Sequence, residues 1–584
     1  MARLSFWFTR VRRRTLIFVA PPSRGSPATK THQEIPVLES ISLKFTELAE
    51  PLCVPAQGVT IFVGPNNSGK SLVLREIEED ISTHSSIASK ILSDFEIAWL
   101  NEEQVNDDIA KLTKNSPVGT SPDYVYVGRF NPSGNVDAGN VPHKTLREYT
   151  AARTNKRWLA SQFLRYFLIR LDGRTRFDLT TDRPRGDLLG QAQNMLMHLF
   201  QDEDARKKVR EIVFDAFNVY FTVEQLSANN LRIRLSSTEP DGNEQNWNEV
   251  AREFHGKALH IKDASDGVQA FVGIVCAVIS GDYRAILIDE PEAFLHPPLA
   301  RKLGHQLTSN LKVGGTLMAS THSPDFLMGC LQASPHVRVV RLEYSNGKSK
   351  GKIVDSAVLT KLFKAPLLRS ANVISALFHD GVVVTESDND RAFYAEIYYR
   401  LAEQEKGYPS ILFVNAQNKQ TIRDIIGPLR AFGVPAAAIV DVDILKDGGG
   451  DWIPWLKAAH VPMALHVGLG HQRASLNRLF AEPKLDMHNG GIKQLGKEDQ
   501  AAANELFDQL RQYGVFAVRN GEIESWLPDL GIISKKAAWT VEMLERLGSD
   551  PNDAAYVKPA AGDIWDFMRD VVKWVKDPGR KGTD

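Results

Sequence analysis

A glycine-rich segment near the amino terminus has the spacing of a phosphate-binding loop. It reads GPNNSGKS, with two glycines five positions apart followed by a lysine and a serine. Glycines let backbone N–H groups approach phosphate oxygens, the lysine neutralises charge on the β- and γ-phosphates, and the serine hydroxyl can ligate Mg²⁺. We therefore expect ATP to be bound by Gly64, Asn67, Gly69, Lys70 and Ser71, with Ser71 also in the Mg²⁺ shell.

The stretches on either side supply the elements that such a loop requires. The apolar run GVTIFVG before it predicts a strand, and LVLREIEEDI after it has the spacing of a helix. A strand, a glycine-rich turn and a helix in this order form anion sites, because the N–H groups of the first helical turn point at the ligand.

Two further motifs follow in the order that a nucleotide site needs. The apolar stretch RAILIDEPE predicts a strand that delivers Asp289 and Glu290 at its carboxyl end, where ligands lie in open α/β sheets. We expect Asp289 to hold the Mg²⁺ shell and Glu290 to polarise the attacking water. His322, in STHSP after the next predicted strand, is placed to sense the γ-phosphate.

These motifs resemble those of the ABC-type ATPases of the RecF, SMC and OLD group, over about residues 36–345. In those families a signature segment of one subunit closes on the nucleotide of another. The matching stretch here is KDASDGVQAF, with Ser265 and Gly267, and it departs from the LSGGQ form of transporters. The resemblance implies an ATP-gated homodimer or higher homo-oligomer that assembles through the ATPase domain. An ordinary Ser-Asp-Gly helix start is the alternative for this segment.

Acidic residues mark the strand ends of a second α/β unit. Glu386 closes the predicted strand VVVTE, and Asp390 lies about one helical turn further on the same side. Asp441 and Asp443 form an Asp-x-Asp at the end of AAAIVDVD, and strand periodicity predicts that both side chains face the same way.

The segment GEIES has the same spacing, with Glu522 and Glu524. Carboxylates gathered at one sheet edge repel each other unless divalent cations neutralise them. The acidic residues therefore predict a site for Mg²⁺ or Mn²⁺ with oxygen ligands. Two such ions about 4 Å apart would activate a water and stabilise the leaving oxygen in phosphodiester cleavage.

The glutamate of the first strand and the later Asp-x-Asp resemble the Toprim fold, over about residues 380–530. A Toprim unit directly after an ABC-type ATPase is similar to the OLD (overcoming lysogenization defect) family of nucleases, in a layout close to the Gabija nuclease subunit and retron-associated OLD nucleases. The resemblance implies metal-dependent cleavage or nicking of DNA, with ATP binding as a control, often in bacterial anti-phage defence.

The same resemblance implies roles for individual residues. The metal ligands would be a first and a second acidic set: Glu386, Asp390, Asp441 and Asp443, then Glu522 and Glu524. The family also uses a C-terminal lysine near the scissile phosphate. Lys558 in YVKPA is the candidate here, and a solvated surface lysine is the alternative.

The motifs divide the chain into three parts. Residues 1–33 are expected to be an N-terminal extension, and residues 34–365 an ABC-type P-loop ATPase domain of the α/β class. Residues 366–584 are expected to be a Toprim, Rossmann-like α/β domain with a C-terminal helical region. Helical patterns predict an insertion over about residues 141–221 of the ATPase domain.

The predicted insertion contains a local excess of positive charge. From Lys144 to Arg185 there are eleven Lys or Arg and four Asp or Glu. Such an excess could bind a DNA backbone without sequence preference. A solvated helix face or the rim of a dimer interface is the alternative.

Composition excludes several other classes of protein. The 584 residues are 43% hydrophobic and 24% charged, which excludes a disordered or fibrous chain, and the net charge of −1 gives no global attraction to nucleic acid or membrane. The three cysteines lie far apart, so they predict neither a disulfide framework nor a zinc site. Since no run of about 18 apolar residues occurs, we expect a cytoplasmic protein with no membrane partner.

Two other functions compete with an OLD-type nuclease. The first is a non-nucleolytic ATP-dependent switch of the RecF or SMC type, whose Toprim domain only holds DNA or a partner. The second is a topoisomerase or primase, which is disfavoured because the chain lacks the zinc-binding cysteines common in primases and has an ABC-type ATPase. A further partner, either a second defence-system protein or a nucleic-acid component, is compatible with the family resemblance.

Overall fold

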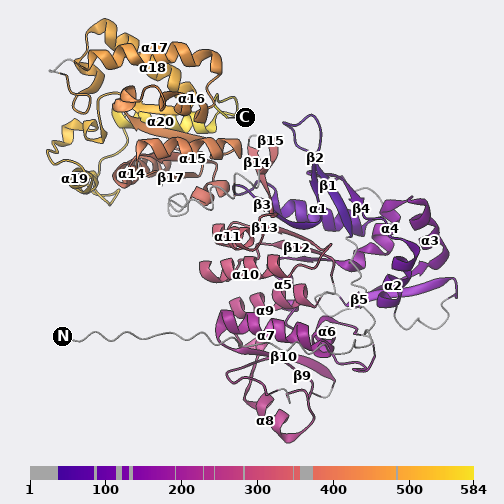
Figure 1. Ribbon diagram of the computed structural model, residues 1–584. Helices are drawn as coiled ribbons and strands as arrows, with labels where there is room; N and C mark the ends of the chain where they lie inside the picture. Colours follow the sequence, from indigo (N-terminus) through magenta and orange to yellow (C-terminus); the bar gives the residue numbers. More distant parts are fainter. Residues whose placement is uncertain are drawn as a thin grey trace, which may run out of the picture.

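The computed structural model describes residues 37–583, except 85–87, 114–120, 131–135, 191, 228, 242–243, 281–282, 346, 355–358, 360–372 and 482–484. The expected N-terminal extension over residues 1–33 and the expected domain boundary near residue 365 lie outside the described residues. Figure 1 shows two lobes, an N-terminal domain and a C-terminal domain, with the strands β14 and β15 between them.

A mixed six-stranded sheet forms the centre of the N-terminal domain. Its strand order is β15-β14-β3-β13-β12-β7, and every neighbouring pair is parallel except β14 and β15. Its central strands are continuous apolar runs, which is typical of parallel strands that helices cover on both faces. The strands are β3 (Gly58–Val63), β7 (Leu168–Leu171), β12 (Ala285–Asp289), β13 (Thr316–Ser320), β14 (Arg338–Ser345) and β15 (Lys348–Val354).

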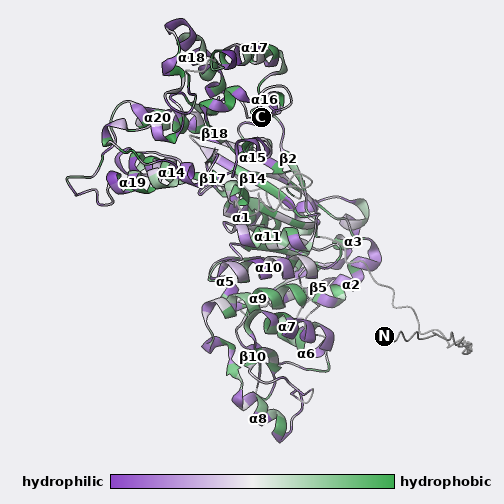
Figure 2. Ribbon diagram, turned by 60° about the vertical axis from the view of Figure 1, so that its left-hand side comes forward, coloured by the Kyte–Doolittle hydropathy of each residue, from purple (hydrophilic) through white to green (hydrophobic). Residues whose placement is uncertain are grey.

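Helices cover this sheet on both faces because successive side chains of each strand alternate. Ile61 of β3 packs with the helices of one face, and the next residue, Phe62, packs with α1 on the other. Helix α1 (Lys70–Ser82) therefore lies on the face opposite to α9 (Asp266–Ile279), α10 (Pro297–Asn310) and α11 (Pro324–Ala333). Figure 2 shows hydrophobic residues concentrated in these inner elements.

The expected helical insertion is wrong in its central part. Helices α3 (His143–Ala152) and α4 (Lys156–Gln162) form as predicted, but the chain then turns and Leu168 to Leu171 become strand β7. This strand pairs with β12 and closes one edge of the central sheet. A short apolar run such as LIRL has no periodicity that distinguishes a strand from a helix, so the pairing with β12 decides its structure.

The rest of the N-terminal domain consists of smaller units around this sheet. A three-stranded antiparallel sheet packs with α1, and a four-stranded group lies beyond α9. The remaining strands are β1 (Leu38–Leu43), β2 (Leu52–Pro55), β4 (Leu92–Ile97), β5 (Tyr124–Phe130), β6 (Val136–Pro142), β8 (Arg183–Pro184), β9 (Tyr220–Glu224), β10 (Asn230–Ser236) and β11 (Leu259–His260). The remaining helices are α2 (Glu102–Leu112), α5 (Thr175–Asp178), α6 (Met195–Gln201), α7 (Glu203–Phe217) and α8 (Glu249–Lys257).

The C-terminal domain contains a four-stranded parallel sheet with the order β17-β16-β18-β19. After β16 the chain forms β17 on one side of it, and then crosses to form β18 on the other side. The direction of the strand order therefore reverses between β16 and β18. Such a reversal leaves a crevice at the carboxyl ends of the two strands, where ligands bind in α/β proteins. The strands are β16 (Gly381–Thr385), β17 (Ile411–Asn415), β18 (Ala436–Asp441) and β19 (Val515–Val518).

Helices again cover both faces. Val383 packs with α14, α19 and α20, whereas Val382 and Val384 pack with α15, α16 and α18. The resulting three layers are those of a Rossmann-like domain, as expected. The helices are α14 (Asp388–Gln404), α15 (Lys419–Ala431), α16 (Trp452–Ala458), α17 (Met463–Leu479), α18 (Lys497–Gln512), α19 (Ala537–Leu547) and α20 (Asp563–Lys576).

The cysteines and the helix lengths agree with the composition. All three cysteines are free thiols, and Cys276 and Cys330 are buried in the hydrophobic core. None of the helices described here is long and apolar enough to cross a membrane.

A buried arginine connects the layers of the C-terminal domain. The Arg430 side chain is fully buried and donates to the carbonyl oxygens of Ala436 at 2.7 Å and Ala459 at 2.7 Å, and to that of Gly582 at 3.1 Å. Burial lowers the pKa of Arg430 to about 9. The guanidinium thus ties a strand, a helix end and the C-terminal tail together through carbonyl acceptors.

We expect Arg430→Gln to destabilise the C-terminal domain by about 3 kcal/mol or more, because several buried carbonyl groups lose their donor. Urea unfolding followed by circular dichroism measures this change. Arg511→Gln is the matched control, since the half-exposed Arg511 binds Asp508 and Asp570 near the surface and its loss should cost less than about 1 kcal/mol. Equal losses in the two variants would contradict this role of Arg430.

Candidate functional site

The phosphate loop joins β3 to α1 with backbone angles that its glycines allow. Gly64 has a φ of 144° and Gly69 a φ of 96°. A Cβ atom on Gly64 would lie 2.1 Å from the carbonyl oxygen of Leu342 in β14, so the neighbouring strand leaves no room for a side chain there. Asn67 also adopts a left-handed φ of 62°, which asparagine tolerates better than most residues.

The Lys70 ammonium group binds within the loop. It donates to the carbonyl oxygens of Gly64 at 2.9 Å and Pro65 at 2.7 Å, and the side chain is almost entirely buried. Burial lowers the pKa of Lys70 to about 8, while Glu290 and Asp289 act in the opposite direction. A phosphate that enters the loop would offer this desolvated cation a charged partner.

The expected Mg²⁺ ligands of this loop lie together. Ser71 donates its hydroxyl to Oδ1 of Asp289 at 2.7 Å, and the Ser320 hydroxyl contacts the same carboxylate oxygen. Asp289 is the last residue of β12 and Ser320 the last of β13, so parallel pairing brings both to the carboxyl edge of the sheet.

Glu290 and His322 also lie at this edge. Their side chains are 3.9 Å apart, from Nε2 of His322 to Oε1 of Glu290. Glu290 has a φ of 50°, and Arg176 donates to its carbonyl oxygen at 2.9 Å and to that of Asp289 at 2.7 Å. The fully buried Arg176 therefore fixes the turn that carries both acids. Burial and the charge of Lys70 lower the pKa of His322.

Sequence reasoning did not identify two residues of this site. Arg176 lies more than 100 positions before the turn that it holds, and no motif marks it. Glu292 accepts a hydrogen bond from the backbone N–H of His322 at 2.7 Å, and burial raises the pKa of this carboxyl. The signal in the sequence was that Glu292 lies two residues after Glu290, in the same acidic segment at the end of the strand.

The expected signature segment packs against the turn that follows Glu290. Ser265 precedes α9 without a side-chain capping bond, and a Cβ atom on Gly267 would lie 2.6 Å from the carbonyl oxygen of Phe294. The described contacts of Ser265 and Gly267 thus do not connect them to the phosphate loop of the same chain. Their binding of nucleotide on another copy stays a prediction.

The acidic residues of the C-terminal domain meet where the strand order reverses. Glu386 follows β16 and Asp441 ends β18, and Oε1 of Glu386 accepts a hydrogen bond from the backbone N–H of Asp441 at 3.3 Å. Asp390, in the first turn of α14, accepts from the backbone N–H of Ser387 at 2.9 Å. We call these residues, together with Asp443, Glu522 and Glu524, the carboxylate edge.

Burial and mutual repulsion disturb the protonation of these carboxyls. Burial, followed by the charges of Glu386, Asp390 and Glu522, raises the pKa of Asp441 to about 9. Burial also raises the pKa of Glu386 to about 7. Burial, together with the charges of Glu524 and Glu522, raises the pKa of Asp390. The carboxylate edge is therefore short of positive charge.

The expected geometry of Asp443 is wrong. Strand β18 ends at Asp441, and Asp443 lies in the 3₁₀ helix over Val442–Lys446, so strand periodicity does not orient it. Its Oδ1 accepts from the Lys419 ammonium at 2.8 Å, and Lys419 also lies 3.2 Å from Asp447. The charge of Asp443 nevertheless contributes to the raised pKa of Glu386.

Lys419 is the cation of this edge that sequence reasoning missed. It is nearly buried and opens helix α15, where the helix dipole disfavours a positive charge. A lysine at the first position after a capping asparagine was therefore a detectable signal for a nearby acidic cluster. Lys419 neutralises Asp443 and Asp447 and leaves Glu386, Asp390 and Asp441 with little compensation.

The second acidic pair lies in a 3₁₀ turn just after β19. Oε1 of Glu522 is 2.5 Å from Nδ1 of His488, and Nε2 of His488 lies 3.1 Å from the Lys446 ammonium. Glu524 accepts from the backbone N–H of Lys536 at 2.8 Å. The charges of Glu524 and Glu522 contribute to the raised pKa of Asp390, so the second set lies near the first, and its role as metal ligands stays a prediction.

The carboxylate edge fits a divalent cation in the type and charge of its donors. Buried carboxylate oxygens with few cationic partners suit Mg²⁺ or Mn²⁺. In the part of the chain that the structure describes, no three His, Cys, Asp or Glu side chains already form a metal-binding group. Side-chain rotation has to accompany binding.

Among the described residues, the Lys558 side chain makes no hydrogen bond or ion pair with this edge. The adjacent Val557 accepts a hydrogen bond from Arg400, ten residues beyond Asp390 on α14, which corresponds to about 15 Å along a helix. Lys558 itself is exposed. The role of Lys558 near a scissile phosphate therefore stays a prediction, beside the alternative of a surface lysine.

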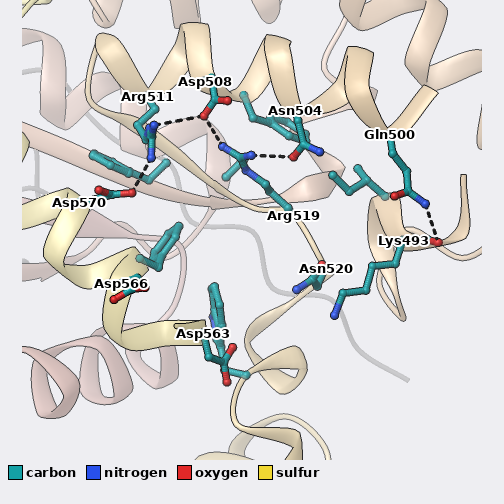
Figure 3. A pocket seen from close by; sticks show the side chains of 16 residues that line it. Lys493, Gln500, Asn504, Asp508, Arg511, Arg519, Asn520, Asp563, Asp566 and Asp570 are labelled. Carbon is teal, nitrogen blue, oxygen red and sulfur yellow. Dashed lines mark hydrogen bonds and ion pairs between the residues drawn. The ribbon is translucent and has the colours of Figure 1, made fainter. Parts of the chain in front are cut away.

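A cavity of about 510 Å³ flanks the carboxylate edge beside β19. Figure 3 shows Asp563, Asp566 and Asp570 of α20 on one side and Arg511 and Arg519 on another. These charges pair with residues nearby: Arg519 donates to Asp508 and Asn504, and Arg511 to Asp570. The cavity therefore has no uniformly basic lining of the kind that follows a phosphate backbone.

The basic excess between Lys144 and Arg185 is largely consumed by contacts within the chain. Lys156 binds Asp94 at 2.8 Å, Arg165 binds Asp137 at 3.0 Å, and Arg176 is buried under the nucleotide site. Arg157 and Arg170 are paired with acids in the same way. These contacts favour the structural explanation of the charge over an open DNA-binding face.

The fold and the two groups of side chains define a class of protein: a P-loop ATPase domain of ABC type followed by a Toprim domain. A family model described as "AAA domain, putative AbiEii toxin, Type IV TA system" matches residues 145–328. A second, for the Toprim domain of overcoming lysogenization defect protein-like proteins, matches residues 377–443.

Two curated nucleases are similar to this chain. The Old nuclease of Escherichia phage P2 is 25% identical over 305 residues, which is 50% of this chain and 50% of that protein. The OLD nuclease of Thermus scotoductus is 22% identical over 456 residues, which is 70% of this chain and 82% of that protein. A solved SMC head bound to the C-terminal winged-helix domain of ScpA aligns at 14% identity with a TM-score of 0.34, covering 56% of this chain and all of that chain. The two domain matches and the two relatives show that this chain is similar to OLD nucleases, with an ATPase domain followed by a Toprim domain.

We expect Asp441→Asn to stabilise the metal-free protein, because the amide removes a charge that Glu386, Asp390 and Glu522 repel. Folding raises the pKa of Asp441, so its contribution to stability is present at low pH and is lost as the pH rises from about 4 to about 9. In EDTA, the melting temperature of the wild type should fall over this range more steeply than that of Asp441→Asn.

Asp443→Asn provides the matched control, since it removes a charge that Lys419 already neutralises. This variant should not be stabilised. Addition of Mn²⁺ should raise the melting temperature of the wild type by more than that of Asp441→Asn. Equal pH slopes for the wild type and Asp441→Asn would contradict the repulsion described above.

Proposed function

We propose that this protein is an ATP-controlled, divalent-metal-dependent DNA endonuclease or nickase of the OLD type. The observation that carries the proposal is the convergence of Glu386, Asp390 and Asp441 at the carboxyl edge of the Toprim sheet, with raised pKa values and few cationic partners. Such a group is poorly stable by itself and is stabilised by divalent cations. The OLD nucleases of phage P2 and Thermus scotoductus support the same activity by similarity.

In this proposal the acidic residues hold the metal and the neighbouring residues position them. A divalent cation bound there supplies Lewis acidity for the phosphodiester and lowers the pKa of water. Glu386 and Asp441 offer carboxylate oxygens from adjacent strands, and the backbone N–H of Ser387 orients Asp390. Lys419 holds Asp443 at the rim, and Glu522 and Glu524 provide the second acidic set.

The same edge carries cations that can face a DNA phosphate. Lys446 is exposed five residues after Asp441 and lies 3.1 Å from His488, which is paired with Glu522. We assign to Lys446 the phosphate-binding role that the family resemblance placed on Lys558. A cation beside the acidic cluster can stabilise the negative charge that develops on a reacting phosphate.

ATP is proposed to act through the N-terminal domain. Lys70 and Ser71 would bind the phosphates and Mg²⁺, Asp289 would complete the Mg²⁺ shell, and Glu290 and His322 would act at the γ-phosphate. Ser265 and Gly267 of a second copy would close the site, so the active form is a homodimer or higher homo-oligomer. Its setting would be the cytoplasm and anti-phage defence, in which a further defence protein or nucleic-acid component can take part.

The first test is nicking of supercoiled plasmid by the purified protein in EDTA, Mg²⁺ or Mn²⁺, with and without ATP. We expect cleavage only with a metal, a loss of at least about a hundredfold in Asp441→Asn, and basal cleavage that no longer responds to ATP in Lys70→Ala. Metal-dependent cleavage that survives Asp441→Asn would exclude the proposed site. DNA binding without cleavage under every condition would favour a non-nucleolytic switch of the RecF or SMC type.

Lys446→Ala and Lys558→Ala separate the two candidate lysines in the same assay. Because Lys446 lies beside the acidic cluster and Lys558 does not, we expect Lys446→Ala to lose about tenfold or more in cleavage rate. Lys558→Ala should cleave at the wild-type rate. The opposite result would return the role to Lys558 and require movement of the segment that carries it.

A further inference from the structure

A second cavity, of about 580 Å³, lies between the ATPase and Toprim domains. One wall is the β14–β15 hairpin, and the facing wall is the turn after α15 together with the C-terminal tail at Arg580. Leu48 and Leu52 close a third side. We call it the junction cavity. Its volume and its position at a domain interface are typical of sites for small organic ligands.

The charged groups of the junction cavity are predominantly basic. Arg341, Lys350, Lys352 and Arg580 line it, against Glu47 and Glu343. Both acids are already paired: Glu343 lies 2.9 Å from Arg341, and Glu47 lies 3.1 Å from Lys348 outside the cavity. Lys350, Lys352 and Arg580 have no ion-pair partner among the residues that the structure describes.

In each of two guanidinium groups of this cavity, one nitrogen lacks a hydrogen-bond acceptor. Nε of Arg341 and Nε of Arg580 are buried, and neither has an acceptor in the described part of the chain. Arg341 is only 3% exposed. A buried donor without an acceptor costs free energy, so two of them beside one cavity require an explanation. An anion between the two arginines would provide one, after a small side-chain shift.

The remainder of the lining is apolar. Leu52 and Ile353 come from the ATPase domain, and Phe432 and Pro435 from the Toprim domain. An inorganic anion would leave this surface without a partner, whereas a phosphate carried on a flat organic body would contact both parts. We propose that the junction cavity binds a nucleoside 5′-monophosphate, with the phosphate between Arg341 and Arg580 and the nucleoside against the apolar lining.

The position of this cavity links its occupant to the nucleotide loop. Arg341 is paired in the sheet with Val63, the residue before the phosphate loop, and the carbonyl of Leu342 packs against Gly64. On the other side, Arg341 donates to the carbonyl oxygens of Gly433 at 3.0 Å and His379 at 3.2 Å in the Toprim domain. A ligand that contacts Arg341 therefore contacts a residue whose hydrogen bonds connect the two domains.

Calorimetric titration of the full chain in EDTA tests the proposal with AMP, GMP, CMP and UMP, their deoxy counterparts, adenosine and inorganic phosphate. We expect at least one monophosphate to bind more tightly than adenosine or phosphate. The ribose and deoxyribose series distinguish a free metabolite from a product of DNA breakdown. Since EDTA removes metal from the carboxylate edge, this outcome does not depend on the proposed nuclease activity.

Two variants of different kinds assign the site. Arg580→Gln should weaken binding by about tenfold or more, since a hydrogen bond to a charged group is lost. Leu48→Trp should reduce binding by filling the cavity without a change in charge. Lys581→Gln is the matched control, because this neighbouring cation binds Gln512 and does not line the cavity. Lys70→Ala should bind as the wild type does.

The proposal is overturned if no monophosphate binds with a Kd below about 1 mM. It is equally overturned if binding is lost in Lys70→Ala, which would place the ligand in the phosphate loop. Binding that is unchanged in both Arg580→Gln and Leu48→Trp would also exclude the junction cavity.

Discussion

Parallel strand pairing is the constraint on which both functional sites depend. Parallel neighbours are joined by crossovers that return the chain to the same edge, so the residues after each strand gather at the carboxyl ends. In the ATPase domain this edge receives the phosphate loop after β3 and Asp289 at the end of β12. In the Toprim domain it receives Glu386 after β16 and Asp441 at the end of β18. Residues that are far apart in the sequence, such as Lys70 and Asp289, thus meet at one edge of the sheet.

The two edges have opposite electrostatic deficits. The ATPase edge holds a desolvated ammonium group, Lys70, which binds loop carbonyls and has a pKa lowered to about 8. The Toprim edge holds desolvated carboxyls, with the pKa of Asp441 raised to about 9. Each edge is least stable when empty of its counter-charge, so a phosphate at the first and a divalent cation at the second would both relieve burial of an unpaired charge. The two edges therefore have the charge deficits that suit an anion and a cation, and both arise from burial.

Local motifs were visible in the sequence, and contacts across long separations were not. The phosphate loop and the strand ends at Asp289 and Asp441 could be predicted because each depends on neighbours within one turn or strand. The gathering of acids could be predicted because parallel strands end at the same edge of a sheet. Arg176 and the pairing of β7 could not, since each is decided by a partner far along the chain. Asp443 shows that a prediction can also fail within a motif. The prediction assumed that the strand continues to Asp443, but β18 ends two residues earlier, at Asp441. The ion pairs of the basic run could not be predicted for the same reason, because its partners, such as Asp94 and Asp137, lie outside it.

Hydrogen bonds of Arg341 connect the two domains, and their chemistry bears on how movement in one domain affects the other. Arg341 belongs to β14, beside the strand that leads into the phosphate loop, and the Leu342 carbonyl fills the space that Gly64 leaves. Protein interiors are close-packed. A phosphate that displaces Gly64 therefore also has to displace β14, which packs against Gly64. Because the Arg341 guanidinium holds carbonyl groups on the Toprim side, movement of β14 changes hydrogen bonds there and not only van der Waals contacts. Those carbonyls, of Gly433 and His379, lie at the amino-terminal ends of β18 and β16, the two strands whose carboxyl ends carry Asp441 and Glu386. A shift transmitted along rigid strands would therefore reach the acidic residues without any contact between the two sites.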